Sequence, residues 1–293
     1  MVAIVVTAPP LVRDRLAEPA ATATGGGRSS LVPRVASALV LAPVALVAVW
    51  LGPPYLMLLV GLAGAVMGWE WARLCGRDAI GLGGAVGIAG IVAGAAAAAL
   101  DAPRIGLSLV LLAGLPFAWL ERDRSVTAAL AGAGVAWIGL PCVALIWLAQ
   151  DAGAGRATVL WILAVVWATD IGAYVIGKAV GGPRLAPRLS PNKTWAGLVG
   201  GIACATATGI AAALAIGAPL LSPLVWLSAV LAVVEQAGDL AESATKRHFG
   251  VKDSSSLIPG HGGLLDRLDG MLAVVPVVAL LSLVGGSSVV TWR

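Results

Sequence analysis

Long apolar runs, separated by short polar or glycine-rich stretches, fill nearly the whole chain. Many of these runs reach the roughly 20 residues that a helix needs to cross a bilayer, and they do not alternate polar and apolar positions as barrel strands do. Because only helices and closed barrels satisfy all backbone groups in lipid, the pattern predicts an all-α, polytopic integral membrane helical bundle. About nine transmembrane helices are expected, at residues 35–51, 54–74, 79–100, 104–120, 126–149, 157–179, 194–217, 219–240 and 264–287.

The pattern also divides the chain. We expect a flexible cytoplasmic tail at 1–33, N-terminal transmembrane helices at 34–156, and a C-terminal transmembrane region at 157–293 that carries most of the candidate chemistry. The run 79–100 is mostly Gly and Ala, and such small residues let helices approach closely. Whether this run spans the membrane fully is left open by the sequence.

Composition and charge placement agree with a membrane protein. Of 293 residues, 59% are hydrophobic and 12% charged, which excludes an ordinary soluble domain. If the N-terminus is cytoplasmic, 16 of the 19 lysines and arginines fall on the cytoplasmic side, as the positive-inside rule requires. Two basic loops, about 178–193 and 241–263, then lie on the same side and are expected to converge.

A row of charges follows the eighth apolar run. Steps of three and four place Asp239, Glu242 and Lys246 on one helix face. The simplest interpretation is a salt-bridged helix end at the membrane surface. Several carboxylates at this depth gain little, however, unless they face a polar cavity or a cation.

The start of the ninth run carries further candidate groups. His261, Gly262 and Gly263 precede Asp266 and Asp269, and N–H groups at such a helix start can bind phosphate. The two aspartates either complement the helix dipole or, with Asp239, hold a divalent cation. Four nearby cations are suited to neutralising phosphate, namely Lys246, Arg247, Lys252 and Arg267. Together these groups indicate phosphoryl or nucleotidyl transfer.

The other basic loop repeats this theme. Asp170 lies inside an apolar run, and Lys193 and Thr194 open the next one. No P-loop pattern precedes them, but a lysine and hydroxyls at a helix start are suited to phosphate. Elsewhere, Glu70 lies three residues before Arg73, most simply as a helix-end ion pair.

The pattern of these residues resembles that of a known family. The pattern Ser243-x-x-Lys246-Arg247, Lys252-Asp253 and Pro259-x-His261-Gly262-Gly263-x-x-Asp266-Arg267-x-Asp269 resembles the signature of phosphatidate cytidylyltransferases, also called CDP-diacylglycerol synthases. The resemblance extends to 170–178, 190–194, 238–243 and 69–73, and covers most of the chain apart from the N-terminal tail.

The resemblance implies that CTP reacts with phosphatidic acid, giving CDP-diacylglycerol and pyrophosphate with Mg²⁺. It implies metal ligands at Asp239, Asp266 and Glu242, and catalytic roles for Asp239, Asp266, Lys193 and Arg267. The implied substrate-binding residues are Asp170, Ser190, Asn192, Lys193, Thr194, Ser243, Lys246, Arg247, Lys252, His261, Gly262, Gly263 and Asp269.

The expected setting is a multi-pass protein of the inner (plasma) membrane whose active site faces the cytoplasm, with no nucleic-acid partner. A second, monovalent cation and a homodimer are left open. Two alternatives also stay open. One is another CTP-dependent enzyme acting on a different membrane lipid; the other, from a different class, is a secondary transporter that uses the intramembrane carboxylates.

Overall fold

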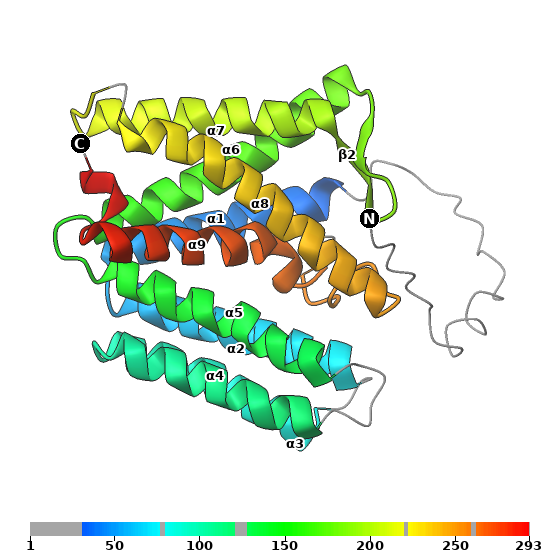
Figure 1. Ribbon diagram of the computed structural model, residues 1–293. Helices are drawn as coiled ribbons and strands as arrows, with labels where there is room; N and C mark the ends of the chain where they lie inside the picture. Colours follow the sequence, from blue (N-terminus) through cyan, green and yellow to red (C-terminus); the bar gives the residue numbers. More distant parts are fainter. Residues whose placement is uncertain (1–30, 77–79, 121–127, 220–221, 259–261, 293) are drawn as a thin grey trace, which may run out of the picture.

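Nine α-helices and one β-hairpin make up the described part of the protein, a computed structural model covering residues 31–76, 80–120, 128–219, 222–258 and 262–292. Figure 1 shows their arrangement. The elements are α1 (Leu31–Leu51), α2 (Tyr55–Gly76), α3 (Leu82–Ala99), α4 (Pro103–Leu120), α5 (Ala128–Ala149), α6 (Gly155–Val180), β1 (Arg184–Ala186), β2 (Ser190–Thr194), α7 (Trp195–Ala215), α8 (Pro223–His248), α9 (Leu265–Gly285) and the short 3-10 helix η3 (Val289–Thr291).

The helices have the length and composition of membrane spans. Eight of them, α2 to α9, are apolar enough over at least 18 residues to cross a bilayer, and α1 has a shorter apolar part at Leu39–Leu51. The predicted all-α, polytopic bundle is therefore confirmed. The Gly/Ala-rich run that the sequence left open forms α3 and meets the same criterion. Most of the predicted tail, residues 1–30, lies outside the described residues.

Small residues hold α3 close to α4. A Cβ atom placed on Gly94 would lie 2.6 Å from Val110 Cγ2, and one placed on Gly106 would lie 2.5 Å from the Gly94 carbonyl oxygen. Larger side chains at these positions would push the helices apart. In lipid no hydrophobic effect drives helices together, so they associate through close packing of this kind.

Helix α9 joins two packed groups of helices. One apolar core is formed mainly by α2 to α5, with a few residues of α1 and α6, and includes Leu265 and Leu272 of α9. A second is formed mainly by α6 to α8 and includes Val274 and Val278 of the same helix. Figure 1 shows α9 (red) running between α5 and α8. The N-terminus of α9 is therefore placed where the two groups meet.

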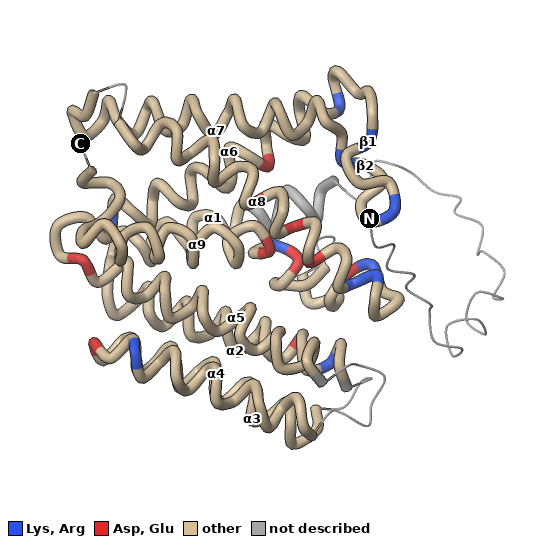
Figure 2. Tube along the Cα trace, viewed as in Figure 1, with Lys and Arg blue, Asp and Glu red and all other residues tan. Residues whose placement is uncertain are grey.

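The two predicted loops are more ordered than the sequence suggested. Helix α6 continues to Val180 and is followed by the antiparallel β1–β2 hairpin, so most of 178–193 is not an irregular loop. Helix α8 continues to His248, which corrects the predicted loop start at 241. The polar end of α8 stays helical because its side chains find partners one turn away, as in the Lys246–Glu242 ion pair. Figure 2 shows charged positions gathered around this end of α8, the start of α9 and the hairpin.

Candidate active site

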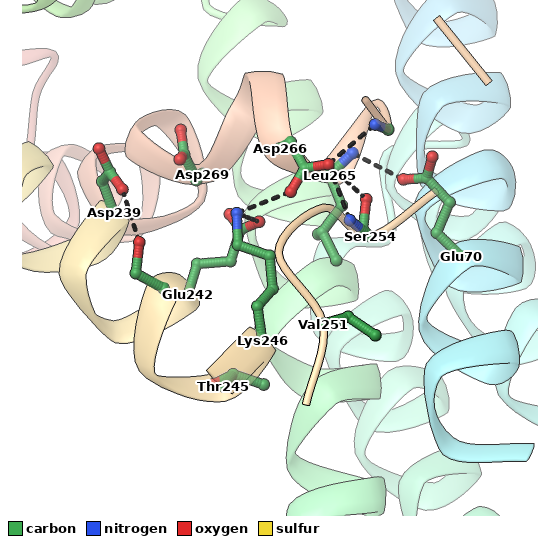
Figure 3. Close-up of polar contacts among 12 residues, drawn as sticks. Glu70, Asp239, Glu242, Thr245, Lys246, Val251, Ser254, Leu265, Asp266 and Asp269 are labelled. Carbon is green, nitrogen blue, oxygen red and sulfur yellow. Dashed lines mark hydrogen bonds and ion pairs between the residues drawn. The ribbon is translucent and has the colours of Figure 1, made fainter. Parts of the chain in front are cut away.

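The charged row of α8 lies on one side of the helix, as its spacing predicted. Figure 3 shows Asp239, Glu242 and Lys246 directed toward the start of α9. Glu242 and Lys246 are only 5% and 8% exposed, and the Lys246 Nζ lies 3.1 Å from Glu242 Oε1. Buried charges are costly unless they are paired and hydrogen-bonded. The row is therefore more than a surface salt bridge.

Asp266 connects this row to the loop before α9. Its Oδ1 accepts a hydrogen bond from Lys246 Nζ at 2.7 Å. Its Oδ2 accepts three more, from Ser254 N at 2.8 Å, Ser254 Oγ at 3.0 Å and Gly263 N at 2.8 Å. A carboxylate with four donors has one fixed orientation. Asp266 thus fixes both the loop and the position of the Lys246 ammonium group.

The glycine pair is required by this crowding. Gly262 has a φ of +83°, a conformation that favours glycine. A Cβ on Gly263 would lie 2.8 Å from Glu70 Cδ and still closer to Ser254 Oγ. The sequence assigned the N–H groups here to phosphate, but the structure uses the Gly263 N–H to bind Asp266. His261 lies outside the described residues.

Glu70 of α2 also reaches this loop. It is fully buried and accepts hydrogen bonds from Ser255 Oγ at 2.6 Å, Leu264 N at 2.9 Å and Leu265 N at 2.7 Å. The sequence suggested only an ion pair with Arg73, whose guanidinium lies 5.0 Å from the Trp69 ring centroid. The sequence did contain a signal for a larger role of Glu70, because this acid lies within an apolar helix and inside a segment that resembles the family.

The hairpin brings a second lysine to the same cluster. Lys193 of β2 forms an ion pair with Asp239 and donates to Gln236 Oε1 at 2.9 Å, while Ser243 Oγ donates to Asp239 at 3.3 Å. The next residue, Thr194, caps α7 by accepting a hydrogen bond from Gly197 N at 3.0 Å. Lys193 therefore brings the first basic segment to Gln236 and Asp239 of α8, just before the predicted second segment at 241–263.

Two other predicted site residues, Ser190 and Asn192, make contacts within the hairpin. Ser190 is paired opposite Ala186 in the β-ladder. The main-chain carbonyl of Asn192 accepts a hydrogen bond from Arg184 Nη1 at 3.3 Å. Both residues therefore fix the strand that presents Lys193, and Asn192 also lines the neighbouring cavity.

Further carboxylates surround the two lysines. Asp269, one turn along α9 from Asp266, interacts electrostatically with Asp239 and Asp170 and accepts a hydrogen bond from Gly270 N at 2.8 Å. The Glu242 Oε2 atom is buried without a hydrogen-bond partner. Among the described residues, no three His, Cys, Asp or Glu side chains form a ready-made metal cage. The described residues thus offer carboxylate oxygens around one region without forming a closed metal cage among themselves.

A cavity of about 590 Å³ opens beside this cluster, between α6, the hairpin and α7. Its lining includes Asp170, Lys178, Arg184, Lys193 and Gln236. Asp170 precedes the end of α6 by ten residues, so at 1.5 Å per residue the cavity reaches about 15 Å along the helix. Polar lining therefore extends well into the apolar part of the bundle.

Three predicted cations lie at the exposed rim. Arg247, Lys252 and Arg267 are all exposed. Arg247 donates to the Val251 carbonyl oxygen at 2.9 Å, and Arg267 interacts electrostatically with Asp170. All three are thus accessible, in contrast to the buried Lys246.

Comparison with known proteins gives one consistent result. Residues 32–284 match the model of the cytidylyltransferase family. The chain is 39% identical over 252 residues to the phosphatidate cytidylyltransferase of Brucella suis, covering 86% of this chain and 93% of that protein. It is 36% identical over 269 residues to the protein of the same name from Pseudomonas aeruginosa, covering 86% and 96% of the two chains. The chain belongs to the cytidylyltransferase family.

Proposed function

We propose that the protein is a phosphatidate cytidylyltransferase, which transfers CMP from CTP to phosphatidic acid and releases CDP-diacylglycerol and pyrophosphate. The observation that supports this most is the juxtaposition of the paired lysine–carboxylate cluster with a polar cavity inside a membrane bundle. A water-soluble nucleotide and a lipid head group can meet only in such a place. The names of the relatives point to the same substrates.

The reaction demands positioning more than acid–base chemistry. A phosphate oxygen of the lipid attacks the α-phosphorus of CTP, the bond to the bridging oxygen of the β-phosphate breaks, and pyrophosphate leaves in line. The attacking phosphate is already ionised near neutral pH, so no strong base is needed. The protein's share is to hold the two anions together and to stabilise the charge of the transition state.

Lys193 and Lys246 are the residues best placed for this role. Each is held by a carboxylate, Asp239 or Asp266, so its ammonium group is oriented before substrate arrives. Such preorganised charge stabilises a transition state without further rearrangement. The exposed Arg247, Lys252 and Arg267 then attract and neutralise the outer phosphates of CTP. Pyrophosphate leaves toward the same aqueous side.

Mg²⁺ fits the carboxylates, although they form no closed cage. Mg²⁺ is usually bound by one or two carboxylates together with substrate phosphates and water, so an incomplete protein site is the expected form. Glu242, with its unpartnered Oε2, would hold the ion. Asp239 and Asp266 would join it only if Lys193 and Lys246, which pair with them here, turned toward the substrate phosphates. The bound ion would neutralise charge on the triphosphate. A second, monovalent cation is a further hypothesis for the same carboxylates.

The lipid would enter beside α6 and α7. Around the cavity, Ile171, Tyr174 and Trp195 are 63%, 64% and 54% exposed, which suits contact with acyl chains. Lys178 and Arg184 of the cavity lining would then meet the lipid phosphate. The nucleotide would occupy the side of Lys246 and the α9 N-terminus. The attacking oxygen is delivered from the membrane and the α-phosphorus from water.

The expected orientation places this end of the bundle in the cytoplasm, because eight of the twelve described basic residues lie either between the end of α6 and the end of the hairpin or between the end of α8 and the start of α9. The membrane would be the inner membrane of a bacterial cell, since the relatives come from bacteria. A cysteine introduced at Arg188 should react with an impermeant maleimide only from the cytoplasmic side. Mass measurement in detergent tests the homodimer.

The activity is tested with purified protein in detergent, labelled CTP, Mg²⁺ and phosphatidic acid. We expect a labelled liponucleotide, and a loss of about 10²–10³-fold for Asp266→Asn, the range for removing one preorganised group. The matched control is Asp101→Asn in the turn that follows α3. The φ angle there is +63°, a conformation that Asn tolerates well. No product from wild type, product only with another lipid, or ion flux without turnover would each overturn the proposal.

A further inference from the structure

Helix α9 begins without a cap of its own. The residue at its N-cap position, Leu264, has no side-chain acceptor, yet the first N–H groups of a helix need partners when buried. Here the acceptor comes from another helix. The Leu264 and Leu265 N–H groups donate to the two oxygens of Glu70 on α2, at 2.9 and 2.7 Å. Glu70 is thus a capping residue supplied from almost 200 positions earlier in the chain.

Glu70 and Asp266 divide one strip of donors between them. The successive N–H groups of Gly263, Leu264 and Leu265 go to Asp266, Glu70 and Glu70, as Figure 3 shows in part. The neighbouring serines are divided in the same way, since Ser254 donates to Asp266 and Ser255 to Glu70. The two carboxylates therefore hold the same loop from opposite ends. Movement of one must displace the donors of the other.

The chain of contacts continues to the proposed chemistry. Because Asp266 Oδ2 is fixed by Ser254 and Gly263, its Oδ1 faces Lys246 at 2.7 Å. Glu70 is fully buried, and both of its oxygens are occupied by the loop. It therefore acts on the site only through the loop and not by touching substrate.

We propose that Glu70 is a positioning residue, which sets the orientation of Asp266, and through it Lys246, by capping α9 from α2. This inference rests on the proposed function for its effect on turnover. It gives the N-terminal helices a defined role, because α2 fixes the start of the helix that carries Asp266, Arg267 and Asp269. The carboxylate form is required because all three donors point at Glu70.

The replacement Glu70→Gln tests this directly. Its amide keeps one acceptor oxygen but turns an NH₂ group toward an N–H donor, so at least one bond to the loop is lost. Misplacement by about 1 Å can cost on the order of 10²-fold, and we expect kcat/KM to fall by about that factor. The KM for CTP should rise more than the KM for the lipid, because Lys246 faces the nucleotide. Glu70→Asp, with a carboxylate on a shorter stem, should recover part of the loss.

Two measurements separate positioning from simple damage. The matched control is Met67→Leu, a volume-conserving change one turn earlier on α2 that buried sites tolerate; it should leave both KM values unchanged. A double-mutant cycle of Glu70→Gln with Ser254→Ala should be non-additive, since both act on Asp266. Three results would overturn the proposal: additive free-energy effects of the two substitutions in the cycle, equal rises in both KM values, or full activity of Glu70→Gln.

Hydrogen exchange keeps the test independent of turnover. In Glu70→Gln the amides of Gly263, Leu264 and Leu265 should exchange faster by tenfold or more, while those in the middle of α2 stay protected. Unchanged exchange at these three amides contradicts the capping role itself. If exchange is faster in the variant but the wild-type protein shows no turnover, the capping role of Glu70 stands and the proposed function is overturned.

Discussion

Lys246 offers the sharpest prediction, because it is a buried cation between two carboxylates. Its Nζ lies 2.7 Å from Asp266 Oδ1 and 3.1 Å from Glu242 Oε1, and the residue is 8% exposed. Lys246→Met keeps the apolar stem but leaves both carboxylates without their partner. Removing one member of a buried ion pair costs about 3–5 kcal/mol. For a chain of this size that corresponds to a fall in Tm of roughly 6–15 °C.

The assay is thermal unfolding in detergent together with turnover. Lys252→Met, which removes an exposed lysine nearby, is the stability control and should stay within about 0.5 kcal/mol. Adding Asp266→Asn to Lys246→Met should recover most of the stability, because the amide oxygen can accept from Ser254 and Gly263 while its NH₂ faces Glu242. Activity should stay lost in the double variant. If Lys246→Met alone were as stable as wild type, the buried pairing would be refuted.

Two further outcomes follow from the same geometry. Gly263→Ala should abolish most activity and lower the Tm by several degrees, since its Cβ would lie 2.8 Å from Glu70 Cδ. The control is Gly250→Ala, where φ is +71° and the surrounding space is open, and it should cost only about 1–2 kcal/mol. Equal effects of the two substitutions would contradict the crowding at Gly263. Chelation of divalent cations should stop turnover, and Glu242→Gln should raise the Mg²⁺ concentration for half-maximal rate by about 10-fold or more; an unchanged Mg²⁺ requirement would remove Glu242 from the metal site.

Much of the site was predictable because its signals are local. The three- and four-residue spacing of Asp239, Glu242 and Lys246 places them on one face of any helix. The distribution of basic residues put the hairpin and the α8 end on one side, and Lys193 does reach Asp239 there. The ends of α6 and α8 were less predictable. Polar residues end an apolar run in the sequence, but they continue a helix when partners lie one turn away.

The sequence alone determined the order of the helices and the identity of the charged groups, because hydrophobic length and helical periodicity depend only on neighbouring residues. It predicted about nine spans, whereas eight described helices are long and apolar enough to cross a bilayer. Tertiary structure decided which partner each group takes. Glu70 is separated from its donors Ser255, Leu264 and Leu265 by 185 to 195 positions, and no local pattern records such a distance. It also decided that the Gly263 N–H serves Asp266, since only the packed loop shows which acceptor is nearest.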